Sequence, residues 1–170
     1  GNSLVALDEQ VNTATAQVDN VYQRRADLIP NLVNTVKGYA KHEATVLTQV
    51  TEARAKVGQV NFSSVKNAED MKKFEANQGA LSSSLSRLMV VSEQYPQLKA
   101  DRNFLELQSQ LEGTENRITV ERQRFNETVQ QFNTAVRQFP RSIIAGMKGM
   151  KDRPYFQAKK GADEAPSVSF

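Results

Sequence analysis

The sequence predicts an all-α protein: an antiparallel up-and-down four-helix bundle with long helices and an irregular C-terminal tail. Its 170 residues include 8 Gly, 5 Pro and no Trp, and aromatic residues make up only 7% of the chain, which argues against a β-rich domain. Apolar residues recur in alternating steps of three and four, the helical period. Short links between these stripes favour antiparallel neighbours. We expect residues 1–140 to form the bundle and 141–170 a tail that packs on it.

The first two helices are expected to meet at a corner. A stripe from Leu4 to Val21 predicts a helix over residues 3–25. Pro30 would cost about 3 kcal/mol inside a helix but is tolerated in a first turn. Asp27 stands three residues earlier and is a favourable N-cap type. We therefore predict a break and a second helix over residues 28–57, while one long helix kinked at Pro30 remains the alternative.

Two further helices follow. Gly58 is a natural terminator of the second helix. Asn67 is an N-cap type and opens the third, over residues 67–95. The fourth, over residues 101–139, carries apolar residues at helical spacing along its length and is followed by a proline.

Composition excludes several classes of site. The chain has no Cys, which removes disulfides, thiolate nucleophiles and Cys-ligated metals. The net charge of +3 comes from 22 basic and 19 acidic residues. A nucleic-acid-binding domain of this size normally carries a denser basic patch, so nucleic acid is a disfavoured partner. No apolar run in the sequence reaches the roughly 20 residues that span a bilayer.

Polar residues interrupt the predicted apolar seams. A buried carboxylate is costly unless it is paired, so Glu43, Gln108, Glu115 and Arg122 are a candidate buried polar layer, with Glu43 and Arg122 as the expected pair. A di-iron carboxylate bundle would need Glu-x-x-His motifs. The single histidine, His42, is not in one. We expect no metal, cofactor, catalytic residue or small-molecule substrate, and the protein is not expected to be an enzyme, although an unrecognised site remains an alternative.

Two surface regions are candidates for contact with other molecules. Around the expected corner, polar residues gather that a core does not require. In the tail, basic residues alternate with apolar ones, which suits anionic lipid, but a solvated basic surface or a contact with protein or nucleic acid remains open. The candidate protein-interaction residues are Arg24, Arg25, Asp27, Asn31 and Asn34, and the candidate lipid contacts are Arg141, Lys148, Lys151 and Arg153.

Several distinctive stretches are distributed along the chain, among them DEQVN at residues 8–12, RRADLIPNLV at 24–33, VKGY at 36–39, TENRI at 114–118 and the closing VSF at 168–170. These stretches resemble the bacterial LemA family, and the resemblance covers nearly the whole chain. One departure is Thr15, where that family often has tryptophan.

The resemblance implies a single-pass protein of the bacterial cell membrane. A short N-terminal membrane anchor would precede residue 2, and the bundle, with its coiled-coil-like seams, would lie on the periplasmic or extracellular side. The family has no established enzymatic role. We therefore expect a membrane-tethered, non-enzymatic interaction or scaffold module that binds an unidentified envelope protein. The alternative is a peripheral lipid-binding or membrane-organising domain that uses the basic tail.

Overall fold

The computed structural model describes residues 3–138 and 153–156, and every regular element within them is a helix, which confirms the all-α class. The elements in chain order are α1 (Leu4–Tyr39), α2 (Ala44–Val57), the 3-10 helix η1 (Phe62–Ser64), α3 (Ala68–Ser92), the one-turn helix α4 (Pro96–Lys99) and α5 (Arg102–Arg137).

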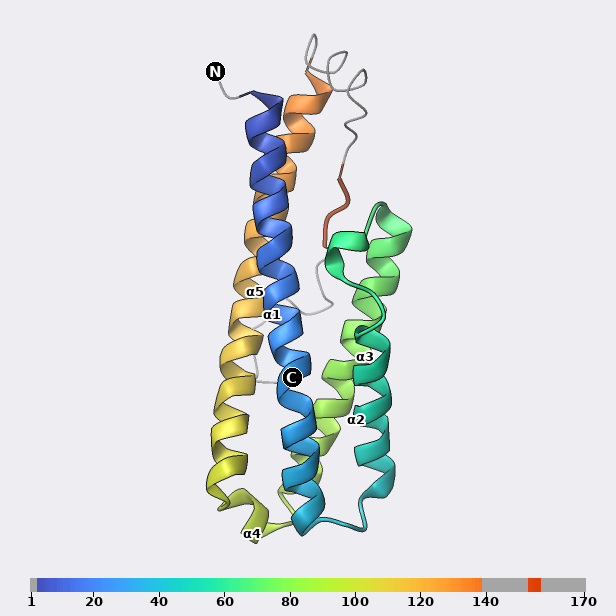
Figure 1. The fold of residues 1–170 in the computed structure, drawn as a ribbon, viewed down its shortest axis with the longest axis vertical. Coiled ribbons are helices and arrows are strands. Elements are labelled where there is room, and N and C mark those ends of the chain that lie inside the picture. The colour runs from blue at the N-terminus through green and yellow to red at the C-terminus, as the bar shows by residue number, and fades with distance from the viewer. Residues whose placement is uncertain (1–2, 139–152, 157–170) are drawn as a thin grey trace.

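The two longest helices, α1 and α5, form an antiparallel pair. Each has 36 residues, or about 54 Å at the standard rise. The two helices run in opposite directions side by side, while α2 and α3 lie beside the pair from the end where α1 stops and α5 begins and leave the opposite end uncovered (Figure 1). The N-terminal end of α1 and the C-terminal end of α5 therefore extend past the other helices.

The core is divided into two apolar clusters. One joins the N-terminal half of α1 to the C-terminal half of α5, with η1 and the start of α3 packed against them. The other joins the end of α1 to α2, the rest of α3, α4 and the start of α5. Polar side chains lie where the clusters meet, among them Arg25, Gln78 and Thr114, all buried.

Helix α1 passes through Pro30 without a break, so the predicted corner is wrong. Proline has no N–H to donate to the carbonyl four residues earlier. That carbonyl, on Ala26, instead accepts a hydrogen bond of 2.8 Å from Nε of Arg54 on α2. Tertiary structure thus replaces the missing bond. Asp27 is not an N-cap but an exposed residue within the helix, where it accepts a bond from Gln23.

The chain reverses later than predicted, at residues 40–43. The Ala40 N–H bonds to the Val36 carbonyl at the end of α1, and Glu43 is the N-cap of α2. The predicted helix 28–57 is therefore the last part of α1 together with α2.

The remaining helix starts agree better with the sequence. Asn67 caps α3 through a 2.8 Å bond from the Asp70 N–H, which confirms that expected cap. Asp101 caps α5 through the N–H of Phe104. The predicted helix 67–95 ends earlier, at Ser92, and the short α4 was not predicted. Of the predicted tail, only residues 153–156 belong to the described part of the chain, and there Phe156 is buried.

Candidate functional site

Arg25 is the centre of a polar layer that crosses the protein between the two apolar clusters. Its side chain is 1% exposed. One guanidinium nitrogen donates to Oγ of Ser82 (2.7 Å) and to Oε2 of Glu115 (3.2 Å). The other donates to the backbone carbonyl (3.1 Å) and to Oε1 (2.8 Å) of Gln78. The side chain of Arg25 thereby joins α1 to both α3 and α5.

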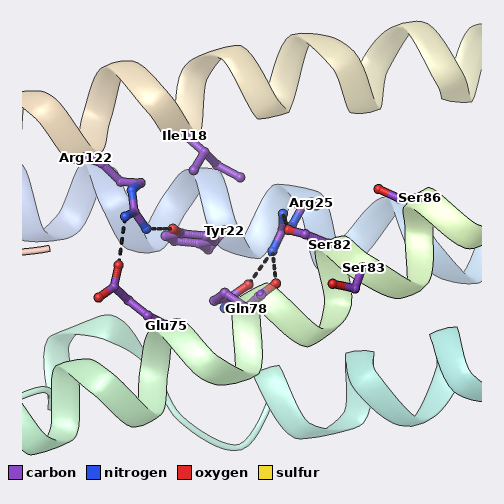
Figure 2. A pocket seen from close by; sticks show the side chains of 10 residues that line it. Tyr22, Arg25, Glu75, Gln78, Ser82, Ser83, Ser86, Ile118 and Arg122 are labelled. Carbon is purple, nitrogen blue, oxygen red and sulfur yellow. Dashed lines mark hydrogen bonds and ion pairs between the residues drawn. The ribbon is translucent and has the colours of Figure 1, made fainter. Parts of the chain in front are cut away.

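A second arginine extends the layer along α5. Arg122 donates to the hydroxyl of Tyr22 (3.0 Å) and to Oε1 of Glu75 (2.8 Å). Figure 2 shows the bonds of Arg122 to Tyr22 and Glu75 and the bonds of Arg25 to Gln78, with the Tyr22 ring between the arginines. The guanidinium carbon of Arg25 lies 5.5 Å from the centre of that ring, within range of a cation–π interaction.

Burial and pairing act in opposite directions on the charges of the layer. Burial lowers the pKa of Arg25, although the nearby Glu115 carboxylate partly offsets this. Burial also raises the pKa of Tyr22. For Arg122, burial disfavours the charge, but Tyr22 and Glu75 more than compensate and the pKa is raised. Arginine side chains stay protonated in proteins, so both guanidiniums are charged at neutral pH.

A hollow of about 370 Å³ opens beside this layer. Serine hydroxyls of α3 form part of its wall, while both guanidiniums are already bound to protein groups. The arrangement can therefore fix the register of α1, α3 and α5, and the hollow has room for a small polar molecule. Its lining is Tyr22, Arg25, Glu75, Gln78, Gly79, Ser82, Ser83, Ser86, Ile118 and Arg122.

Of the four residues predicted to form a buried polar layer, the structure places Glu115 and Arg122 in the layer around Arg25. Glu43 lies at the start of α2 and accepts a 2.9 Å bond from the hydroxyl of Tyr95. Tyr22, the partner of Arg122, lies about 25 Å along α1 from that end, so the predicted Glu43–Arg122 pair is wrong. Gln108 is half-buried, about two turns of α5 before Glu115.

The predicted interaction residues divide between the interior and the surface. Arg25 is inside the protein, so its assignment to a contact surface is wrong. The other four are exposed. Their steps of three, four and three place them on one face of α1, and Ile29, two residues from both Asp27 and Asn31, points the opposite way into the core. We call Arg24, Asp27, Asn31 and Asn34 the outer stripe.

Of the four candidate lipid contacts, only Arg153 is in the described part of the chain. Its guanidinium forms an ion pair of 2.8 Å with Asp8 at the N-terminal end of α1. Arg141, Lys148 and Lys151 lie outside the described residues.

Residues 3–138 and 153–156 contain no group of three or more His, Cys, Asp or Glu side chains that could hold a metal ion. Within the same ranges, none of the helices has the length and apolar character needed to cross a bilayer.

Sequence reasoning missed Tyr22, Glu75, Gln78 and Ser82 as members of the layer. A signal was present for Arg25. It occupies the core-facing position between Tyr22 and Ile29 in steps of three and four, which becomes visible once α1 is treated as continuous.

These features define an all-helical protein built on a long antiparallel helix pair with an internal arginine layer. The LemA family model matches residues 14–170, and the chain belongs to this family.

Curated relatives are distant in sequence. Magnetosome protein MamQ 2 of Paramagnetospirillum magneticum is 24% identical over 95% of this chain and 66% of its own length. Magnetosome protein MamQ of Magnetospirillum gryphiswaldense has the same identity and coverage. Protein LemA of Metamycoplasma hominis is 21% identical over 94% of this chain and 69% of its own. The chain thus spans slightly less than two thirds of the magnetosome proteins that it matches.

Proposed function

We propose that this chain is a non-enzymatic interaction or scaffold module of the bacterial envelope, in which the helices form an antiparallel four-helix body. A segment preceding this body would tether it to the cell membrane on the extracytoplasmic side, as the family resemblance implies. The outer stripe would contact an envelope protein. The observation that supports the proposal is that two neighbouring residues of α1 differ in burial: Arg25 lies in the core, whereas Arg24 is exposed on the surface.

The outer stripe supports a contact role because its side chains are exposed. Arg25 has a structural reason, since it joins three helices. Arg24, one residue earlier, and Asn34 are exposed. Asp27 accepts a bond from Gln23 on the same helix, and Asn31 accepts a 3.3 Å bond from Asn103 at the start of α5. A rigid helix that presents polar groups of both charge signs suits a specific, reversible protein contact.

The polar layer supports a structural role over a catalytic one. A general base or nucleophile must be available to a substrate. Here the acids of the layer, Glu75 and Glu115, are each bound to an arginine. Such an internally bound layer specifies helix register.

Site-specific photo-crosslinking in cells tests the proposal. A photoreactive amino acid replaces Asn31 in the full-length protein, and a matched variant carries it at Lys72, an exposed position of α3. We expect a discrete adduct in the membrane fraction from position 31 and not from 72. Arg24→Glu in the same chain should reduce that adduct. Identical adducts from both positions, or an adduct unaffected by Arg24→Glu, would contradict the outer stripe as the interface.

The lipid-binding alternative has one candidate residue fewer, because Arg153 is paired with Asp8. It is tested separately by flotation of the chain with anionic vesicles at low salt. Absence of flotation excludes this alternative, whereas flotation lost at high salt would favour it.

A further inference from the structure

Residues 153–156 lie along α5, held by two asparagines seven residues apart. Oδ1 of Asn133 accepts from the Arg153 N–H (2.8 Å), and Nδ2 donates to the Arg153 carbonyl (3.0 Å). Asn126 makes the same two bonds with Phe156, at 2.9 and 3.2 Å. Seven helical residues span about 10.5 Å, and three steps of extended chain span about 10 Å. The spacing of the asparagines therefore fits an extended segment that runs antiparallel to α5.

Phe156 inserts into an aromatic pocket. The side chain is 4% exposed. Its ring stacks on Phe62 with centroids 4.9 Å apart, and Phe125 meets it edge-on at 5.5 Å. The guanidinium carbon of Arg122 lies 4.2 Å from the centre of the ring. The polar layer thus borders this pocket.

Arg153 and the middle residues complete the recognition pattern. The Arg153 guanidinium pairs with Asp8 and lies 5.6 Å from the ring centre of Phe132. Tyr155 remains 36% exposed. The groove therefore recognises the backbone through two asparagines and reads side chains at the first and fourth positions, as peptide-binding grooves do with extended ligands.

We propose that this groove also accepts residues 153–156 of a second copy of the chain, so that copies assemble by exchanging the segment. Every contact described above is made by the segment itself, so a copy supplied by another chain can make the same contacts. Such exchange of an identical element is a low-cost route to dimers.

Chain length permits the exchange. Asn133, which holds Arg153, is only about 7.5 Å along the helix from residue 138. The intervening residues 139–152 can span at most about 50 Å when fully extended, several times the distance needed within one chain. Protein concentration then decides between the two arrangements, because the segment of the same chain has a high effective concentration at the groove.

Two full-chain variants separate the groove from its ligand. The donor-deficient chain carries Arg153→Ala and Phe156→Ala and keeps the groove. The groove-deficient chain carries Asn126→Ala and Asn133→Ala and keeps the segment. We expect each variant alone to remain monomeric in sedimentation velocity, and the labelled groove-deficient chain to bind the donor-deficient chain one to one in a titration.

A matched control is available on the same helix. Gln123 and Gln130 are also seven residues apart on α5 but are exposed. Placing Gln123→Ala and Gln130→Ala in the donor-deficient chain should leave its affinity unchanged, whereas Asn126→Ala and Asn133→Ala in that chain should weaken it at least about tenfold, because four hydrogen bonds are lost. No association in the mixture, or equal association of both acceptors, would overturn the proposal.

A charge exchange tests the same groove without removing buried groups. An Asp8→Arg acceptor should bind the Arg153 segment more weakly and should bind a segment carrying Arg153→Asp more tightly. If the affinities do not change with these charge reversals, association uses a different surface.

Discussion

The hydrogen bond from Arg54 to the Ala26 carbonyl lets α1 continue through Pro30, and its contribution to stability can be predicted. Pro30 cannot donate to the Ala26 carbonyl, and Nε of Arg54 takes this role at 2.8 Å. Removing the Arg54 side chain leaves a partly buried carbonyl without that partner. An unsatisfied buried polar group costs about 1–3 kcal/mol, so Arg54→Ala should lower the free energy of unfolding by about 2 kcal/mol.

The same substitution should cost less when residue 30 can donate. In a Pro30→Ala chain, the new N–H can bond to the Ala26 carbonyl as in any α-helix. Arg54→Ala should then cost below about 1 kcal/mol, which gives a coupling of about 1 kcal/mol or more between the two positions. Pro30→Ala alone should stabilise the protein, because alanine is the better helix former by up to about 3 kcal/mol.

Urea unfolding of the wild-type chain, both single variants and the double variant measures this cycle. Lys56→Ala, an exposed change on the same helix as Arg54, is the control and should lie within about 0.5 kcal/mol of wild type. Additive effects of Pro30→Ala and Arg54→Ala, or a destabilising Pro30→Ala, would refute the reasoning.

Three further predictions concern other contacts. Phe156→Ala should lower stability by about 1–3 kcal/mol in urea unfolding, less than a phenylalanine within a core helix because the segment can detach, while Tyr155→Ala should have little effect. Asp101 has a lowered pKa because it accepts a bond from the hydroxyl of Tyr39 and caps α5. The free energy of unfolding should therefore fall as the pH drops below about 4. Asp101→Asn should make this pH dependence smaller. Burial raises the pKa of Tyr22, so stability should decline above about pH 10, and Tyr22→Phe should reduce the decline while costing about 1 kcal/mol at neutral pH.

Hydrophobic periodicity predicted the core well. The six stripe residues from Leu4 to Val21 are all buried, as are the apolar stripe positions of α3 from Met71 to Leu88. This follows because a helix in a packed protein must bury one continuous face, and the apolar residues of the sequence recur at the helical spacing that forms such a face. The LemA assignment also came from the sequence, through stretches such as RRADLIPNLV.

The break at Pro30 was predicted wrongly because a local rule was applied where a tertiary contact decides. The cost of an interior proline is offset by Arg54, which is 24 residues away in the sequence and invisible to a local pattern. Yet the core-facing steps Tyr22, Arg25, Ile29 and Leu32 continue through the proline without a change of phase. Continuity of the apolar face was the better guide, and it would also have placed Arg25 in the core.

The sequence contained only a weak indication of the groove that binds residues 153–156. Phe-Asn occurs twice, at Phe125-Asn126 and Phe132-Asn133, seven residues apart. The phenylalanines are accounted for by the core, but heptad-spaced asparagines beside them have no role in a helix alone. Their role depends on a segment about 20 to 30 residues later in the chain, and only the three-dimensional arrangement reveals that pairing.

The central claim is that α1 is one helix that places Arg25 in the core and Arg24 on the outer stripe. The most direct test compares Arg24→Ala and Arg25→Ala by urea unfolding under identical conditions. Arg25→Ala should lower the free energy of unfolding by about 3–5 kcal/mol, because Glu115 loses its buried partner, and Arg24→Ala should change it by less than about 0.5 kcal/mol. Equal losses from the two neighbouring substitutions, or a larger loss from Arg24→Ala, would contradict this placement.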